Sequence, residues 1–105
     1  MSDRIVAFST VGKAKDAERI ARALVERRLA ACVNVLPGVV SFYRWKGDVC
    51  RDGELLLVIK TRAERLEALQ EALVALHPYE LPELVVVPIE SGHPPYLEWL
   101  DESVS

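Results

Sequence analysis

The sequence is short of the residue types that most often carry chemistry. Its 105 residues include only two cysteines and two histidines, beside 16 acidic and 13 basic residues. The net charge of −3 argues against a broadly basic surface for nucleic acids. No apolar run approaches the roughly 18 residues that a membrane-spanning helix needs, and the opening MSDRIVAF lacks the regions of a signal peptide. We therefore expect no nucleic-acid partner and no membrane partner.

The scarcity of cysteine also bears on compartment and cross-linking. Two cysteines, Cys32 and Cys50, suit a reducing environment, and we expect a cytoplasmic protein. If Lys46-Gly47 is a two-residue hairpin turn, Cys50 lies opposite Tyr43 and Cys32 lies opposite Thr61. A bulge would shift that register by only a residue or two. The sequence therefore predicts no disulfide within the chain.

Length and composition suit one ordinary domain. The chain has room for a single domain over residues 1–105. Half of its residues are hydrophobic and 28% are charged, which is typical of a globular protein and far from a disordered one. A domain of this size can form a core, but it gains much from oligomerisation.

Hydrophobic periodicity predicts alternating strands and helices. Apolar spacings of three and four indicate amphipathic helices, whereas short β-branched and aromatic runs indicate strands. Thr61 and Glu64 have the spacing of a capping box at the start of the second helix, and His77-Pro78 ends it. The expected elements are a buried strand over 3–10, a helix over 14–29, a hairpin over 30–61, a helix over 63–76, a buried strand over 84–89 and a terminal helix from 92.

The hairpin from Ala30 to Thr61 is the most informative segment. At about 3.3 Å per residue its arms would extend about 45–50 Å, whereas a domain of this size has a radius of gyration of about 13 Å. Its own core cannot cover such a hairpin. Pro37-Gly38 and Asp52-Gly53 interrupt the two arms, because proline cannot donate to a strand ladder and glycine weakens one.

The order of elements predicts the fold class. A βαββαβ succession is that of an α+β, ferredoxin-like domain, here with a long central β-hairpin and an extra C-terminal helix. Right-handed crossovers place both main helices on one face of a four-stranded antiparallel sheet. The other face then needs cover, and within one chain only the terminal helix is available.

The densest polar cluster is His77-Pro78-Tyr79-Glu80. An imidazole beside a carboxylate can bind a transition metal. The alternative is a histidine favoured at a helix C-terminus by the helix dipole. Two further possibilities are weaker: Gly12-Lys13 lacks the spacing of a phosphate-binding loop, and Cys32 is more typical of a buried small hydrophobe than of a nucleophile.

Four segments in register resemble one family. They are LVERRLAACVNVLPGVVSFYRWKG (24–47), ELLLVIKT (54–61), HPYELPELVVVPI (77–89) and YLEWL (96–100). Together they resemble the CutA family of divalent-cation tolerance proteins. The resemblance implies a compact homotrimer in which the long hairpins extend sheets across subunit boundaries. It also implies an architecture similar to that of the PII signalling proteins and a link to copper and other divalent metals.

The resemblance carries a metal site over only in part. In some bacterial members a first-strand cysteine and paired histidines before Pro-Tyr are proposed copper ligands. Here the first of these positions is Ser9, and Leu76 precedes His77. Cu(I) prefers thiolate, so we expect at most weak binding of Cu(II) or another divalent transition metal. His77 and Glu80 are the expected metal contacts, and no organic cofactor is expected.

A second hypothesis assigns the function to a ligand cleft. In that case a trimeric, PII-like scaffold would bind ligands in clefts between subunits, and aromatic residues would line them. The same aromatic residues could instead be interface anchors. An enzyme is not expected, because no acid–base pair or activated nucleophile stands out. The expected cleft residues are Lys60, Tyr43, Trp45, Tyr79, Tyr96 and Trp99.

Overall fold

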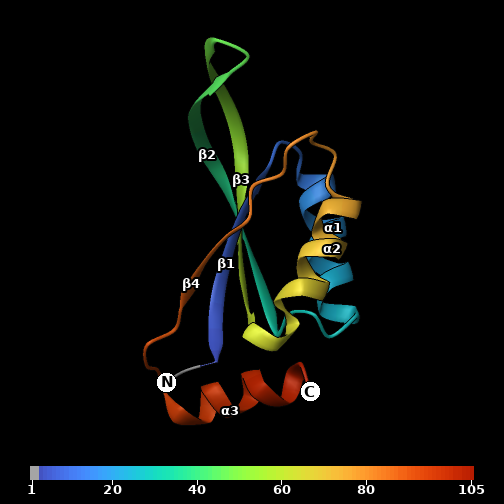
Figure 1. The fold of residues 1–105 in the computed structure, drawn as a ribbon, viewed down its shortest axis with the longest axis vertical. Helices are drawn as coiled ribbons and strands as arrows, with labels where there is room; N and C mark the ends of the chain where they lie inside the picture. Colours follow the sequence, from blue (N-terminus) through green and yellow to red (C-terminus); the bar gives the residue numbers. More distant parts are fainter. Residues whose placement is uncertain (1–2) are drawn as a thin grey trace.

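The computed structural model describes residues 3–105, and its strands and helices follow the predicted order (Figure 1). The strands are β1 (Arg4–Val11), β2 (Cys32–Trp45), β3 (Asp48–Arg62) and β4 (Val85–Pro88). The helices are α1 (Ala14–Glu26), α2 (Leu66–Leu76) and α3 (Pro94–Ser103), and a 3₁₀ turn, η1 (Ala63–Arg65), leads into α2. No helix of the described residues is long and apolar enough to cross a membrane.

The four strands form one antiparallel sheet in the order β2-β3-β1-β4. Helices α1 and α2 lie side by side on one face, and α3 lies across the end of the sheet near the N-terminus (Figure 1). This arrangement confirms the predicted α+β, ferredoxin-like fold with its long hairpin and extra C-terminal helix. The face opposite α1 and α2, here called the open face, carries no helix of the described residues along most of its length.

The core lies between the sheet and the two long helices. Alternate residues of β1 are buried on the helix side, as expected where one face of a strand is covered. They meet Ile20 and Leu24 of α1 and Leu69 and Leu73 of α2, all of which are fully buried. The three- and four-residue spacing of apolar side chains therefore identifies the buried helix faces correctly.

Helix α1 ends three residues before the predicted boundary at Leu29. Arg28 adopts the left-handed conformation with φ 58°. Its N–H donates to the carbonyl of Val25, and the N–H of Leu29 donates to that of Leu24. These two bonds form a Schellman motif, which usually has glycine at the left-handed position. The motif turns Leu29 into the core, so its apolar side chain fits the helical period without being helical.

The predicted capping box at the start of the second helix is wrong. Thr61 belongs to β3 and is fully buried, and its hydroxyl donates to the carbonyl of Leu29 at 2.8 Å. Most buried hydroxyls are hydrogen-bonded, and here the long-range bond takes the place of a local cap. Arg62 occupies the position before η1 without a side-chain capping bond. The helix ends at Leu76, as His77-Pro78 predicts.

The hairpin register follows the turn up to one bulge. Lys46 and Gly47 both have positive φ, at 50° and 88°, as in a type I′ turn. Tyr43 faces Cys50, as predicted, but the extra residue at Pro37-Gly38 shifts the register, so that Cys32 faces Lys60 instead of Thr61. Both cysteines are free. The predicted interruption at Asp52-Gly53 is wrong, because β3 continues through it and Gly53 pairs with Val40.

The hairpin projects beyond the rest of the sheet. Strand β1 pairs with β3 only as far as Leu55, so residues 48–54 of β3 pair with β2 alone. The chain measures 44 × 25 × 23 Å as a result. Phe42 on this projection is 69% exposed. The prediction that one core cannot cover the hairpin is therefore confirmed for the single chain.

Strand β4 differs from its predicted burial. It is the edge strand of the sheet, and all four of its residues are exposed. Val85 pairs with Phe8 and Val87 pairs with Val6, so these valines share the open face with Phe8 and Val6. An apolar run indicates that a strand will be covered, but it does not say by what. Among residues 3–105, none covers β4.

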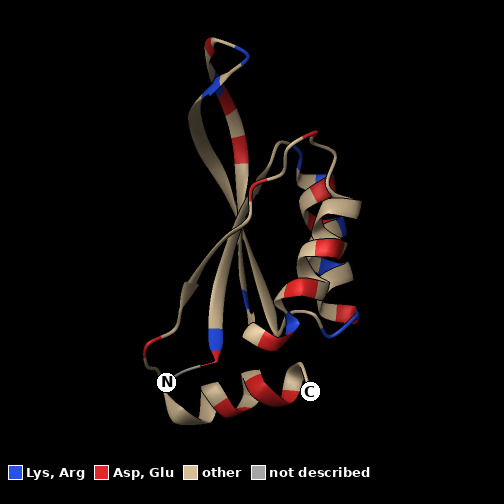
Figure 2. Cartoon of the chain, viewed as in Figure 1, with Lys and Arg blue, Asp and Glu red and all other residues tan. Residues whose placement is uncertain are grey.

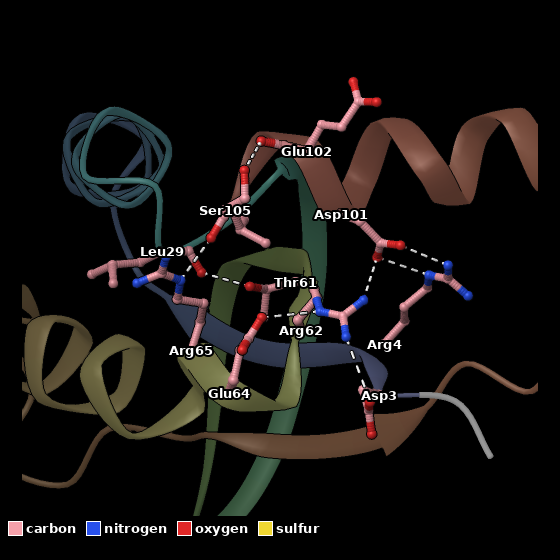
Figure 3. Close-up of polar contacts among 11 residues, drawn as sticks. Asp3, Arg4, Leu29, Thr61, Arg62, Glu64, Arg65, Asp101, Glu102 and Ser105 are labelled. Atoms are coloured by element: carbon pink, nitrogen blue, oxygen red, sulfur yellow. Dashed lines mark hydrogen bonds and ion pairs between the residues drawn. The ribbon is translucent and has the colours of Figure 1, made fainter.

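Polar contacts fasten α3 to the sheet (Figure 3). Arg4 donates to both Asp101 oxygens, at 2.9 and 2.7 Å, and Arg62 donates to Oδ1 at 2.6 Å. These guanidinium hydrogen bonds lower the pKa of Asp101 to about 2. Arg65 also donates to the carbonyl of Val104 at 2.7 Å. A small apolar cluster around Leu100 completes the docking.

Candidate functional site

A cavity of about 760 Å³ lies between the projecting hairpin and the connection from α2 to β4. That connection, residues 77–84, crosses the sheet beyond the end of β1 to reach the open face (Figure 1). The volume falls in the range of small-molecule sites, roughly 300–1,000 Å³. The lining residues are Thr10, Ser41, Phe42, Tyr43, Arg44, Trp45, Asp52, Glu54, Tyr79, Glu80, Leu81 and Glu83.

His77 fixes the start of this connection. The residue is buried, with only 7% of its surface exposed. Nε2 lies 2.8 Å from the carbonyl oxygen of Thr10, and Nδ1 lies 3.1 Å from the backbone nitrogen of Tyr79. A carbonyl can only accept and a backbone N–H can only donate. The imidazole is therefore the neutral Nε2–H tautomer, with both nitrogens engaged.

Tyr79 carries the connection into contact with the hairpin. Its hydroxyl donates to Glu54 Oε2 at 2.6 Å. Burial, and next the hydrogen bond to Glu54, raises the pKa of this phenol. The phenol passes over Gly12, where a Cβ would lie 3.1 Å from the hydroxyl oxygen. Glycine at position 12 therefore leaves room for the Tyr79 hydroxyl. The weak resemblance of Gly12-Lys13 to a phosphate-binding loop did not predict this role.

A second phenol–carboxylate pair lies on the hairpin itself. The hydroxyl of Tyr43 donates to Asp52, and this bond raises the pKa of Tyr43 to about 12. Tyr43 and Asp52 lie on the same side of the hairpin as Glu54, since Ser41 pairs with Asp52 and Val39 with Glu54. Both phenols stay protonated near neutral pH and act as donors to carboxylates within one cavity.

The six residues predicted to line a ligand cleft fall into two groups within one chain. Tyr43, Trp45 and Tyr79 line the cavity. Lys60, Tyr96 and Trp99 gather near α3. There the ammonium of Lys60 lies 5.8 Å from the Tyr96 ring, and the Tyr96 and Trp99 ring centroids are 5.3 Å apart. The single chain therefore brings together half of the predicted cleft.

The predicted metal contacts are placed less favourably. Glu80 is exposed on the rim of the cavity, but both His77 nitrogens already have partners. In the described part of the chain, residues 3–105, no three His, Cys, Asp or Glu side chains are grouped to hold an ion. A closed transition-metal site needs three or four ligands. These residues do not fit one in a single chain, and a contact through His77 would require breaking one of its hydrogen bonds.

Sequence reasoning missed the acidic side of the cavity. Asp52 and Glu54 lie on β3, and Glu83 lies on the connection, 3.4 Å from the Thr10 hydroxyl. The sequence could have indicated them, because Glu54 directly precedes the apolar run Leu55–Ile59 and lies two residues after Asp52. Two residues at that spacing in a strand point to the same side of the sheet. Their convergence with Tyr79, 25 residues further on, depends on the path of the connection.

The fold and this cavity define a class of protein. It is a ferredoxin-like domain with a projecting β2–β3 hairpin, and a cavity large enough for a small molecule lies at the base of that hairpin. Residues 5–103 match the model of the family described as "CutA1 divalent ion tolerance protein". The chain belongs to the CutA1 family. The resemblance seen in the four sequence segments is thereby confirmed.

Individual relatives agree over nearly the whole chain. The divalent-cation tolerance protein CutA of Thermus thermophilus is 51% identical over 98 residues, covering 93% of this chain and 95% of that protein. Protein CutA of Mus musculus is 49% identical over 102 residues, covering 94% of this chain but 58% of the mouse protein. The chain thus spans little more than half of that relative's length.

Solved structures give the same result. CutA from Xylella fastidiosa superposes with a TM-score of 0.96 at 46% identity, covering 99% of this chain and 100% of that one. The names of other matches specify different compartments. A relative in Arabidopsis thaliana is called chloroplastic, and a solved structure from Archaeoglobus fulgidus is called periplasmic.

Proposed function

We propose that this chain acts in tolerance of divalent metal cations, as a homotrimer that contacts metal ions only weakly. The observation that carries the proposal is the family match over residues 5–103, with relatives named for divalent-cation tolerance. A non-catalytic role is part of the proposal, because no acid–base pair or activated nucleophile stands out in the sequence. The single domain over residues 1–105 and the cytoplasmic location, suited to two free cysteines, are parts of this proposal.

Two features of the chain support the trimer. Leu36, Val85 and Val87 expose apolar side chains on the open face, and contiguous exposed apolar surface marks interaction sites. The edge strand β4 also presents an unpaired row of backbone groups that a neighbouring strand can pair with. Light scattering tests the trimer directly. The expected mass is three times the 11.7 kDa of the chain, and a stable monomer at micromolar concentration would contradict it.

Metal contact through His77 and Glu80 is expected to be weak. The imidazole must give up its bond to Thr10 or to Tyr79 before a nitrogen lone pair is free. The loss of that hydrogen bond lowers the affinity for the metal ion. Calorimetric titration with Cu(II) and with Zn(II) tests this, with His77→Ala and Glu80→Gln compared with the parent. Isotherms that are the same for His77→Ala and the parent would remove His77 from the proposal.

A second candidate function is ligand binding by a trimeric, PII-like scaffold, without an organic cofactor. Its support is that Tyr43, Trp45 and Tyr79 line one cavity of suitable volume. In the trimer of this candidate, a neighbouring subunit would bring its own second group, Lys60, Tyr96 and Trp99 near α3, to the same cleft. A thermal-shift screen of metabolites tests it, because a ligand that binds the folded state raises the melting temperature. The absence of any stabilising metabolite would count against this candidate.

A further inference from the structure

The cavity at the base of the hairpin combines negative charge with aromatic surface. Four carboxylates line it, those of Asp52, Glu54, Glu80 and Glu83, against the single guanidinium of Arg44. Figure 2 shows acidic positions on the projecting part of β3 and on the connection that crosses the sheet. Charges of one sign around a concave, low-dielectric surface focus the electrostatic potential. This cavity therefore favours a cation.

Glu54 is the most buried of these carboxylates. The residue is only 8% exposed, and it lines the cavity. Oε2 accepts the hydrogen bond from Tyr79, but Oε1 accepts none from the residues that the structure describes. An ionised carboxylate has about four acceptor sites, and the Tyr79 hydroxyl occupies one of them. Glu54 thus has free acceptor capacity inside the cavity.

The aromatic lining adds a second kind of affinity for cations. Phe42, Tyr43, Trp45 and Tyr79 all border the cavity, and a ring face attracts an ammonium group within about 6 Å. Two of these rings already attract cations of the chain itself. The guanidinium of Arg51 lies 5.9 Å from the Phe42 centroid, and the Lys46 ammonium lies 5.8 Å from that of Trp45. Ring surface also suits the methylene groups of an organic ligand.

The spacing of the carboxylates distinguishes an organic cation from a metal ion. Within residues 3–105 no three of them, with or without His or Cys, are close enough to hold one ion. Separated carboxylates suit separated ammonium groups on an apolar chain. We infer that the cavity binds a linear polyamine, with ammonium groups at Glu54 and at the acidic rim and the methylene chain along the aromatic rings. This inference rests on the second candidate function, ligand binding by the cavity.

Calorimetric titration of the full chain with spermidine, in metal-free buffer, tests the inference. Glu54→Gln keeps an acceptor for the Tyr79 hydroxyl, so it preserves the fold while removing the charge. We expect it to weaken spermidine binding about tenfold, since a charge-assisted hydrogen bond is replaced by a neutral one. Glu83→Gln, at an exposed position, provides a second cavity variant that does not risk folding. Glu18→Gln, on the exposed face of α1 away from the cavity, is the matched control and should bind like the parent.

Three results would overturn the inference. They are no spermidine binding, equal affinities for the parent and both cavity variants, or equally tight binding of Mg²⁺ at matched ionic strength, which would show no preference for an organic cation. These results are distinct from failure of ligand binding as such. If the metabolite screen finds an anionic ligand while spermidine fails, the ligand-binding function stands and the polyamine inference falls. Light scattering tests the trimer independently of the ligand-binding function and of the polyamine inference.

Discussion

Ser9 is the residue whose environment departs most from ordinary packing. Among the residues that the structure describes, its Oγ is the only buried side-chain oxygen or nitrogen without a hydrogen-bond partner. The residue is fully buried on the helix side of β1. A buried polar group left unpaired costs roughly 1–3 kcal/mol. We therefore expect Ser9→Ala to raise the free energy of unfolding by about 1 kcal/mol, measured by denaturant titration at fixed protein concentration.

Thr61 supplies the matched control for Ser9. It is also a fully buried hydroxyl residue of the sheet, but its hydroxyl donates to the carbonyl of Leu29. Thr61→Val keeps the shape of the side chain and leaves that carbonyl without its donor. We expect it to lower the free energy of unfolding by about 1 kcal/mol. If both substitutions destabilise the protein equally, the Ser9 hydroxyl has a partner after all.

Arg28 carries a backbone conformation that its side chain disfavours. Its φ of 58° closes the Schellman motif after α1, and a left-handed conformation costs a non-glycine residue roughly 1–2 kcal/mol. Glycine removes this cost but adds chain entropy in the unfolded state. We expect Arg28→Gly to raise the free energy of unfolding by about 0.5–1 kcal/mol.

The neighbouring residue is a control for that substitution. Arg27 lies within the motif, directly before Arg28, with φ −86°, which any residue adopts without strain. Arg27→Gly should therefore lower the free energy of unfolding, because only the entropy term remains. Thermal or denaturant unfolding of both variants at one protein concentration makes the comparison. Equal effects of the two substitutions would show that the left-handed conformation is not strained here.

At the scale of elements, docking of α3 should depend on pH. The guanidinium hydrogen bonds lower the pKa of Asp101 from its ordinary value of 3.8 to about 2. At pH 2–4 the unfolded chain therefore binds a proton that the folded chain does not. This contribution to stability is complete above about pH 4 and is lost as the pH falls through about 2. The free energy of unfolding, measured from pH 5 to pH 2, should show this decline. Asp101→Asn should remove the part of the decline that comes from protonation of Asp101.

Glu102 is the control for the pH experiment. It follows Asp101 on α3, but Figure 3 shows its carboxylate pointing away from the arginines. Glu102→Gln should leave the pH dependence between 2 and 4 as in the parent. If Asp101→Asn also leaves it unchanged, the contacts with Arg4 and Arg62 do not persist in solution. Above pH 5 Asp101→Asn should still lower the melting temperature, because it replaces a charged acceptor of three guanidinium hydrogen bonds.

The elements that sequence reasoning placed correctly are those governed by local interactions. The apolar period identifies the buried faces of α1 and α2, and the Lys46-Gly47 turn sets the register of the hairpin tip. The failures depend on distant partners. Thr61 bonds to Leu29, 32 residues away, so it does not cap a helix. The exposure of β4 depends on its place at the sheet edge, which an apolar run cannot specify.

The same distinction applies to the candidate site. Aromatic type alone suggests Tyr43, Trp45 and Tyr79 as lining residues, and the cavity contains all three. The importance of Glu54 appears only when the connection brings Tyr79 within 2.6 Å of it. The engagement of both His77 nitrogens likewise depends on Thr10, at the end of a distant strand. Residue types therefore suggest candidate groups, but their pairing requires the fold.

At the scale of the whole molecule, the projecting hairpin is the feature that the proposed trimer must explain. Phe42 leaves 69% of its surface exposed there, although fully burying such a side chain contributes about 1.5–3 kcal/mol. If a neighbouring subunit covers it, Phe42→Glu loses that contribution at three equivalent sites and adds a buried charge. We expect the concentration at which the trimer dissociates to rise at least tenfold, measured by sedimentation velocity over a dilution series.

Val74 provides a control of similar character on a different face. It is 51% exposed on the outer side of α2, away from the hairpin and the open face, so Val74→Glu should leave the dissociation concentration unchanged. Equal weakening by both substitutions would mean a general loss of stability and not a lost contact. If Phe42→Glu has no effect, the trimer forms through other surfaces and the hairpin projects into solvent. Because neither side chain contributes to the core of its own subunit, the pair tests assembly separately from folding.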